Sequence, residues 1–277
     1  MEDDPLFRRT RQHAELRLNF SSDQSDKRRL QQIKGFVRLQ REMLLRYHQK
    51  GDSGLRLTRA RSVILDVLIQ HLYAYAIKAA SESLGKTKPM CVMATGGYGR
   101  GELSPHSDID LMFLYSKSSM GKSLDILKET MTREILYPLW DTGMKIGHAT
   151  REIKEAIAES QKDIRNKNSM LDSRFICGDR KVAKKFTAKF NKFCKKNNPL
   201  QYLEEVLRHQ HKRRSEKGNT VFLQAPDVKN GVGGLRDYQG IFWMSKVKFD
   251  TTGLDGLIKR NYLTEHEAKS FKEAYSF

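Results

Sequence analysis

The feature that most constrains the fold is a glycine-rich stretch that lies between two short apolar runs. Residues 90–94 lead into the glycines at residues 96–101, and residues 111–115 follow Asp108 and Asp110. Short apolar runs bounded by turn residues predict buried β-strands. Because side chains alternate along a strand, the two aspartates are expected on the same face. The sequence therefore predicts a strand–turn–strand segment with two carboxylates where its second strand begins.

This arrangement of glycines and acids predicts a particular chemistry. Neighbouring carboxylates repel each other, and their burial without a cation is costly. Mg²⁺ removes this cost and prefers one or two carboxylates together with substrate phosphates. Glycines offer phosphates exposed backbone N–H groups and close approach without Cβ atoms. A phosphate cradle beside a metal-binding acid pair is the layout of a nucleotidyltransferase. The alternative is a glycine turn with the acids at a solvated strand end.

Two stretches of the sequence carry a resemblance to a known family. Residues 96–111 read Gly-Gly-Tyr-Gly-Arg-Gly-Glu-Leu-Ser-Pro-His-Ser-Asp-Ile-Asp-Leu. They resemble the active-site signature of the bacterial PII uridylyltransferase/uridylyl-removing enzymes, which belong to the polymerase-β-like nucleotidyltransferase superfamily. Residues 229–237, Lys-Asn-Gly-Val-Gly-Gly-Leu-Arg-Asp, resemble the second signature of that family. Family members often have an acid where this chain has Asn230. The resemblance covers roughly residues 50–277.

The fold expected from the chain is of the α+β class. Strands and helices alternate in the central region, which favours an α/β or α+β fold. The resemblance implies a polymerase-β-like nucleotidyltransferase domain, with a small mixed sheet flanked by helices, followed by an all-helical domain. We expect an N-terminal arm and helix at residues 1–50, the nucleotidyltransferase domain at 51–165 and the helical domain at 166–277. The polar residues 1–25 are expected to form a mobile arm.

The periodicity of apolar residues predicts the remaining elements. Alternation at residues 144–150 predicts a third strand, and Thr264 with Glu267 predicts a capping box at the start of a final helix. Helical periodicity predicts helices at residues 26–49, 58–83, 124–140, 153–160, 170–177, 181–195 and 200–217, and from residue 235 onward.

Composition limits the class of protein. No apolar run approaches the ~20 residues of a membrane helix, and the N-terminus lacks the features of a signal peptide. The three cysteines have no metal-binding spacing and are typical of reduced thiols in a cytosolic protein. The formal net charge of +18 favours anionic partners, namely a nucleotide, a nucleic acid or an acidic protein surface. We therefore predict a cytoplasmic protein without a membrane partner.

The basic segment at residues 181–196 has two interpretations. Phe186, Phe190 and Phe193 are interleaved with its lysines, and proteins that bind single strands do stack bases on aromatic side chains. These phenylalanines recur at helical spacing, however, so we interpret them first as the buried face of a helix. The lysines then form a solvated face, and a nucleic-acid patch is the alternative.

The resemblance implies transfer of a nucleoside monophosphate, with UMP expected, from a nucleoside triphosphate to a hydroxyl group of a PII-like protein. Pyrophosphate is released. Gly96 and Gly97 would bind the β- and γ-phosphates through N–H groups, and Ser107 would add a hydroxyl contact. Asp108 and Asp110 would bind Mg²⁺ or Mn²⁺, with UTP as the expected substrate.

Further residues receive roles from the same resemblance. Arg100 would either offset charge on the leaving pyrophosphate or pair with Glu102. Lys229 and Arg236 would contact nucleotide phosphate or the protein substrate, across the cleft from the first signature. Asp237 is expected to cap its helix or to pair with Arg236. The glycines before that helix also suggest an anion site at its N-terminus.

A third carboxylate is usual in this superfamily, but the strand expected to carry it contains none. Asp163 is our candidate, followed by Asp172 and Asp141, and His148 is an alternative base. In the strand, a buried structural histidine is the first interpretation of His148. Without such a group, turnover would be slow.

Two rival functions stay open from the sequence. One is a nucleotidyltransferase that acts on RNA, and the other is a non-catalytic nucleotide-binding regulator. The chain has no His-Asp dipeptide, so the uridylyl-removing activity of the resembled enzymes is not supported by these residues. The helical pattern runs to Phe277, from which we expect a fragment of a longer protein or a chain cut at a domain edge.

Overall fold

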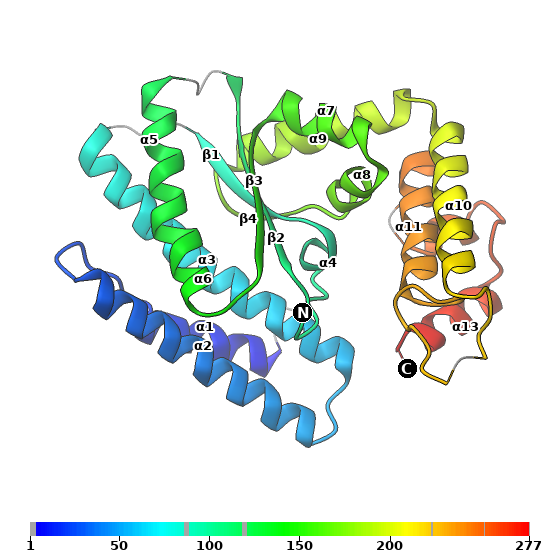
Figure 1. The fold of residues 1–277 in the computed structure, drawn as a ribbon, viewed down its shortest axis with the longest axis horizontal. Helices are drawn as coiled ribbons and strands as arrows, with labels where there is room; N and C mark the ends of the chain where they lie inside the picture. Colours follow the sequence, from blue (N-terminus) through cyan, green and yellow to red (C-terminus); the bar gives the residue numbers. More distant parts are fainter. Residues whose placement is uncertain (1–3, 86–88, 118–120, 223, 252, 277) are drawn as a thin grey trace. The chain divides into compact units, whose positions relative to one another are not determined.

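The structure is a computed structural model, and the chain forms two compact units. Unit 1 comprises Met1–Glu159 with Asp172–Lys185, and unit 2 comprises Ser160–Leu171 with Phe186–Phe277. The boundaries expected at residues 50 and 165 do not coincide with these units, because the N-terminal helices pack within unit 1. Figure 1 labels the elements. The structure describes residues 4–85, 89–117, 121–222, 224–251 and 253–276.

Unit 1 contains a four-stranded mixed sheet with the strand order β3-β2-β1-β4 (Figure 1). β1 (Met90–Ala94) pairs antiparallel with β2 (Ile109–Tyr115) and with β4 (Arg174–Gly178), whereas β3 (Ile146–Glu152) runs parallel to β2. The central strands are almost wholly buried. The three strands predicted from the sequence and the α+β class are therefore confirmed.

Residues 174–178 form the strand β4, so the helix predicted at residues 170–177 was wrong. A short apolar run such as Phe-Ile-Cys suits a strand or a helix, and only pairing with a partner decides between them. That partner, β1, lies far earlier in the chain. Gly178 ends the strand at a φ of +95°, where a Cβ would lie 2.5 Å from the Met90 carbonyl oxygen. Long-range pairing thus overrides the helical periodicity.

One face of the sheet carries the main hydrophobic core of unit 1. Ile109, Leu111 and Phe113 of β2 belong to this core, together with apolar side chains of α3 (Gly54–Leu84) and α5 (Lys122–Met131). Because side chains alternate along a strand, Asp110 lies on the opposite face. The acid is therefore kept out of the main core.

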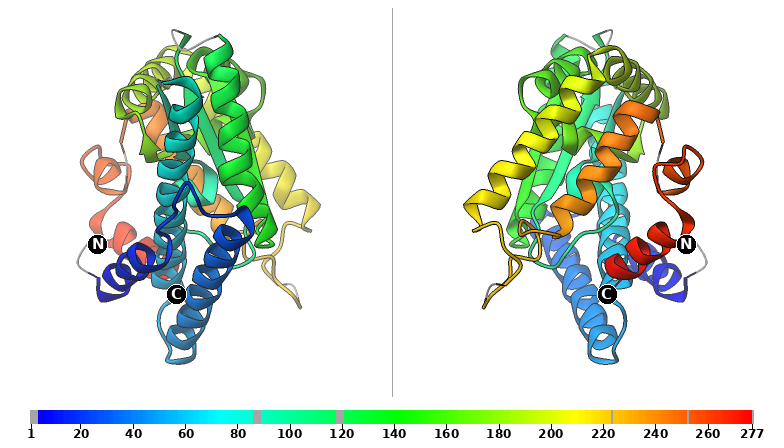
Figure 2. Two further views of the ribbon diagram at one scale, coloured as in Figure 1. Left: turned by 90° about the vertical axis from the view of Figure 1, so that its left-hand side faces the viewer. Right: turned by 90° about the vertical axis from the view of Figure 1, so that its right-hand side faces the viewer.

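The described N-terminal residues pack as helices within unit 1, so the prediction of a mobile arm was wrong. α1 (Pro5–Arg17) lies beside α2 (Asp26–Gln49) and α3 (Figure 2). The side chain of Asp4 caps α1. Thr10 donates a buried hydrogen bond to Gln40 of α2 at 3.1 Å. Gln40 interrupts the apolar stripe of α2 because it is the polar partner of α1.

The helix predicted at residues 124–140 is present but contains a π-helical turn. η2 (Thr132–Leu136) separates α5 from α6 (Tyr137–Asp141). In this turn Glu134 is buried and accepts from Arg29 of α2 at 2.6 Å. Arg29 also donates to the Tyr75 hydroxyl of α3 at 2.5 Å. A buried ion pair therefore joins α2, α3 and η2.

Among the described residues, α3 is long and apolar enough to cross a membrane by length and composition. This differs from the expectation that no apolar run approaches that length. The apolar side chains of α3 line the main core of unit 1. The core helix of a globular protein satisfies the same criteria, and α3 is such a helix.

The regular elements of unit 2, within its described residues, are helices. Thr264 and Glu267 bond to each other's backbone N–H groups at 3.1 and 2.8 Å, which confirms the predicted capping box. α7 (Ile153–Lys162) and α9 (Arg180–Lys196) each run from unit 1 into unit 2. The helices are α8 (Ile164–Leu171), α9 (Arg180–Lys196), α10 (Pro199–Glu216), α11 (Leu235–Phe249), α12 (Asp255–Ile258) and α13 (Glu265–Ser276).

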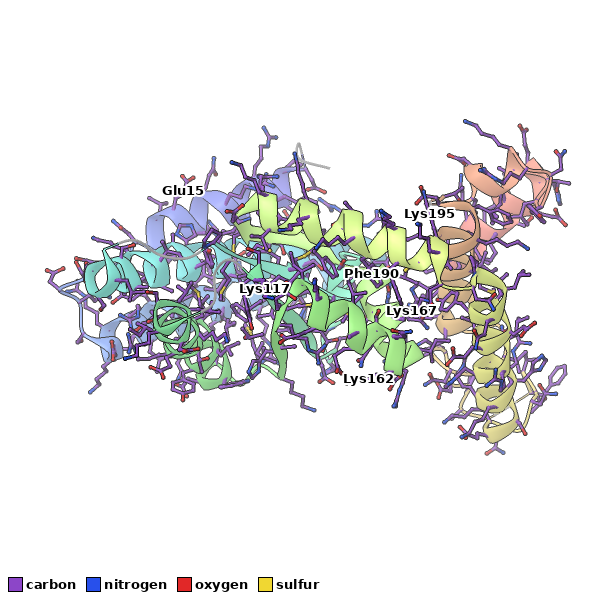
Figure 3. The ribbon with its side chains drawn as sticks, turned by 90° about the horizontal axis from the view of Figure 1, so that it is seen from above. Glu15, Lys117, Lys162, Lys167, Phe190 and Lys195 are labelled. Atoms are coloured by element: carbon purple, nitrogen blue, oxygen red, sulfur yellow. The ribbon has the colours of Figure 1, made fainter. Side chains whose placement is uncertain are left out.

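α9 confirms the predicted buried face for Phe186 and Phe190, whereas Phe193 is half-buried. Phe186 and Phe190 are buried and stacked with ring centroids 5.5 Å apart. The lysines of the helix are exposed, and Lys195 pairs with Asp250 at 2.7 Å. Figure 3 labels Phe190 and Lys195 on this helix. Rings packed in this way are not available to stack on nucleic-acid bases.

We predict that Glu134→Ala strongly destabilises the protein. The side chains of Arg29 and Glu134 are only 5% and 6% exposed, so Arg29 would lose its buried partner. Breaking such a pair costs roughly 3–5 kcal/mol. Urea unfolding measures the change in unfolding free energy.

The exposed pair Lys269–Glu273 provides the control for this prediction. Its loss in Lys269→Ala is expected to cost less than about 1 kcal/mol. Equal effects of the two substitutions would contradict the structural role given to the buried pair.

Candidate active site

The glycine turn after β1 forms the first part of the site. It contains the short helix α4 (Gly96–Gly99), and Gly96 has a φ of +58°, in the region that favours glycine. The N–H groups of Gly96 and Gly97 lie in the first turn, where the helix itself provides no acceptor. The Thr95 N–H donates to the Asp110 carbonyl oxygen at 3.0 Å. This bond ties the turn directly to the start of β2.

A partly buried polar network holds α4 in place. The Tyr98 hydroxyl donates to Asp66 of α3 at 2.7 Å, and Arg174 of β4 donates to both oxygens of the same carboxylate at 2.7 and 3.0 Å. Arg174 also donates to the carbonyl oxygens of Tyr98 and Gly99, each at 3.3 Å. Burial raises the pKa of Tyr98, and the Asp66 carboxylate raises it further. The hydroxyl therefore keeps its proton and acts as a donor.

Sequence reasoning missed Asp66 and Arg174. A signal for Asp66 was present, because it is a carboxylate within the apolar residues 63–69 of α3. An acid in such a stretch indicates a buried, paired carboxylate. Arg174 gave no signal, because its segment was predicted as a helix.

The glycine turn also packs tightly against residue 172. A Cβ on Gly99 would lie 2.2 Å from the Asp172 carbonyl oxygen, so only glycine permits this approach. The Arg100 guanidinium pairs with Asp172 at 2.5 Å and with Glu102 at 3.4 Å. Of the two roles considered for Arg100, the structure contains the pairing with Glu102. The contact with pyrophosphate stays a prediction.

The loop between the glycine turn and β2 is anchored on α3. Leu103 is fully buried, and its N–H donates to the Thr58 carbonyl oxygen and to the Ser62 hydroxyl, each at 3.3 Å. The Ser107 N–H donates to the Ser104 carbonyl oxygen at 3.1 Å. Ser107, the predicted hydroxyl contact for phosphate, is thus held in a defined turn next to Asp108.

The two predicted metal-binding acids lie at the start of β2. Asp108 directly precedes the strand and is exposed, whereas Asp110 is its second residue and is half-buried. Their carboxylates are the hard oxygen donors that Mg²⁺ prefers. No group of three or more metal-ligating side chains occurs in the described ranges of the chain. Two carboxylates suit a metal that also takes ligands from substrate phosphates, and the metal site at these acids stays a prediction.

The candidate third carboxylate, Asp163, lies in unit 2 and caps α8. It accepts the Arg165 N–H at 2.7 Å and pairs with the Arg165 side chain at 2.8 Å. Hydrogen bonds from Arg165 hold the pKa of Asp163 below its usual value. Its role as a third carboxylate stays a prediction. Asp172 pairs with Arg100, and Asp141 is exposed where α6 ends.

His148 does not lie with the acids. Its ring packs edge-on against Trp140, with centroids 5.6 Å apart. It follows Gly147, which is aligned with Asp110 across the β2–β3 pair, so alternation directs His148 to the other face. His148 is also exposed, so the expectation of a buried strand histidine was wrong.

The second signature forms a closed turn before α11. The N–H groups of Leu235 and Arg236 donate to the carbonyl oxygens of Val228 and Lys229 at 2.9 and 3.0 Å. A Cβ on Gly234 would lie 2.9 Å from the Val228 oxygen. These donors are therefore not free to bind an anion, which corrects the expected site at this N-terminus. The side chain of Lys229 is exposed.

Asp237 pairs with two arginines of α10, whereas one alternative of the sequence analysis had named Arg236 as its partner. It binds Arg213 and Arg214 of α10, the latter at 2.7 Å. Burial alone would raise the pKa of Asp237, but hydrogen bonds from α10 side chains and a backbone N–H outweigh it and lower the pKa. Arg236 instead donates to Gln239 at 3.1 Å.

Comparisons with known proteins match two segments of the chain to nucleotidyltransferase families. The family model described as GlnD PII-uridylyltransferase matches residues 201–277, and that described as glutamate-ammonia ligase adenylyltransferase matches residues 10–137.

Curated relatives are named bifunctional uridylyltransferase/uridylyl-removing enzyme. The relative from Bradyrhizobium sp. (strain BTAi1) is 32% identical over 232 residues, which is 82% of this chain and 24% of that protein. The relative from Azospirillum brasilense is 31% identical over 238 residues, which is 85% of this chain and 25% of that protein. The chain thus spans about a quarter of the length of the curated relatives that it matches.

We predict that Tyr98→Phe destabilises the protein by about 1.5–3 kcal/mol, the usual contribution of a hydrogen bond to a charged group. The substitution removes one donor to the half-buried Asp66 carboxylate and leaves the ring in place. Chemical denaturation measures the change. Tyr137→Phe is the matched control, because Tyr137 is 53% exposed and a surface change is expected to stay within about 0.5 kcal/mol. Equal stability of both variants would contradict a stabilising role for the hydrogen bond from Tyr98 to Asp66.

Proposed function

Because the chain belongs to the PII-uridylyltransferase family over the part that it spans, we propose that it transfers UMP from UTP to a hydroxyl group of a PII-like protein. The oxygen of that hydroxyl attacks the α-phosphorus, and pyrophosphate leaves. The proposal is supported by one observation above all. The Thr95 N–H, directly before α4, donates to the Asp110 carbonyl oxygen, so the proposed phosphate donors and the proposed metal ligands are joined through the backbone.

The acids fit a divalent metal. Asp108 and Asp110 would hold Mg²⁺ or Mn²⁺, which when bound neutralises phosphate charge and stabilises the attacking and leaving oxygens. The two carboxylates leave coordination positions for phosphate oxygens, as Mg²⁺ sites commonly do.

The protein's own groups act by positioning and electrostatics. The N–H groups of Gly96 and Gly97 bind the β- and γ-phosphates, with the hydroxyl of Ser107 beside them. Arg100 adds positive charge, part of which Glu102 and Asp172 already balance.

Two further roles belong to this proposal. Lys229 and Arg236 contact nucleotide phosphate or the protein substrate. Asp163 is the candidate to accept the proton of the attacking hydroxyl. We expect the reaction in the cytoplasm, where a PII-like substrate and nucleotides occur together.

RNA is the second candidate acceptor, because the net charge of +18 favours a polyanion. The buried rings of Phe186 and Phe190 weigh against it, since they cannot serve as stacking platforms. The protein acceptor is therefore preferred, and a nucleotide-binding regulator without transfer is the remaining outcome of the test.

The test incubates the protein with each labelled nucleoside triphosphate, Mg²⁺ or Mn²⁺, and either a PII-type protein or RNA. Label from UTP on the protein is the expected result. Label on RNA would identify the second candidate, and nucleotide binding without transfer would identify a regulator.

We predict that the double substitution Asp108→Asn with Asp110→Asn lowers transfer by at least about 100-fold, the scale of losing one electrostatic contact to transition-state charge. The fold is expected to persist, because Asp108 is exposed and Asp110 half-buried. The rate of label transfer and the circular dichroism spectrum are measured together. Asp125→Asn is the control, since Asp125 is an exposed acid of α5. Transfer by the double variant at the wild-type rate would place the metal site elsewhere.

A further inference from the structure

Gly147 of β3 lies directly beside the acid pair. It is aligned with Asp110 across the parallel β2–β3 pair. Side chains of aligned residues on adjacent strands project from the same face of a sheet. A Cβ at position 147 would lie 2.7 Å from Oδ1 of Asp110 and 3.9 Å from its Cγ. Apart from Gly147 itself and its two neighbours in the chain, the described residues place no other atom within 4 Å of that position.

The usual reasons for a glycine do not apply at this position. The φ of Gly147 is outside the left-handed region, so backbone conformation does not require glycine. At Gly99 and Gly178 an added Cβ would collide with backbone atoms, which fixes those glycines for packing. At Gly147 the obstacle is a carboxylate. Glycine inside a strand weakens it and often marks a place where another group approaches closely.

We propose that Gly147 is a positioning residue for Asp110. The missing side chain keeps open the space that the carboxylate occupies when it is directed toward the metal and the nucleotide. A methyl group there would turn the carboxylate about its χ angles, which the fold tolerates. Mg²⁺ demands near-ideal octahedral geometry and would not tolerate the same rotation. This inference rests on the proposed function, because it assigns Asp110 to the metal.

The first measurement is metal binding without turnover. Binding of Mn²⁺ is followed by electron paramagnetic resonance in the presence of a non-hydrolysable UTP analogue, for the full chain and for Gly147→Ala. We expect Mn²⁺ affinity to fall about tenfold in the variant, while binding of the analogue without metal is unchanged. Gly35→Ala is the matched control with unchanged affinity, because a Cβ at Gly35 meets nothing within 4 Å.

The second measurement asks whether Gly147 acts through Asp110. Gly147→Ala is made in the wild-type chain and in Asp110→Ala, and the melting temperatures form a double-mutant cycle. In Asp110→Ala the carboxylate is absent, so the added methyl should raise the melting temperature, as Gly→Ala does at an ordinary φ. In the wild-type chain that gain is expected to be smaller or absent. An equal change in both backgrounds would show that the two residues do not interact, and would overturn the proposal.

The wild-type protein separates the two ways in which the idea can fail. If it neither binds Mn²⁺ with the analogue nor transfers label, the proposed function fails and the role of Gly147 fails with it. If it binds Mn²⁺ and Gly147→Ala binds equally well, the proposed function stands and the positioning role of Gly147 is overturned.

Discussion

The hydrogen bonds to one half-buried carboxylate hold the site together. Asp66 of α3 accepts from the Tyr98 hydroxyl and from two nitrogens of Arg174, so a helix, the glycine turn and β4 meet at one group. A carboxylate in such a place is costly unless it is fully paired. Arg174 extends the pairing to the carbonyl oxygens of Tyr98 and Gly99. Glycines adopt many conformations, and this network selects one of them for the turn.

The mixed sheet determines what surrounds the acids. β2 is central, so one of its faces lies on the main core and Asp110 is left on the other. The parallel pairing with β3 then aligns Gly147 with Asp110, and alternation turns His148 away. A shift of one residue in this register could align His148, instead of Gly147, with Asp110 and so place a side chain beside the acid. The register of an exposed strand therefore matters to the site as much as the acids themselves.

Local patterns in the sequence predicted the elements whose signal is local. Neighbouring residues alone predicted β1 and β2 from their apolar runs and α2 and α3 from their periodicity. They also placed the two acids at the start of β2. β4 was missed because its partner lies far earlier in the chain. α1 was missed because part of its contact with α2 is polar, through Thr10 and Gln40. The partners of Asp66 and Asp237 also depend on tertiary packing, which the spacing of residues does not contain.

The two glycine-rich signatures use glycine for opposite purposes. In the first, the N–H groups of Gly96 and Gly97 lie in the first turn of α4, where the helix itself provides no acceptor, and we propose that they bind phosphate. In the second, Gly234 permits the loop to close on itself, and its carbonyl oxygens take the N–H groups of Leu235 and Arg236. A closed loop has little left to offer an anion except its side chains. Any contribution of the second signature to binding must therefore come from exposed charges such as Lys229, and not from the N-terminus of α11.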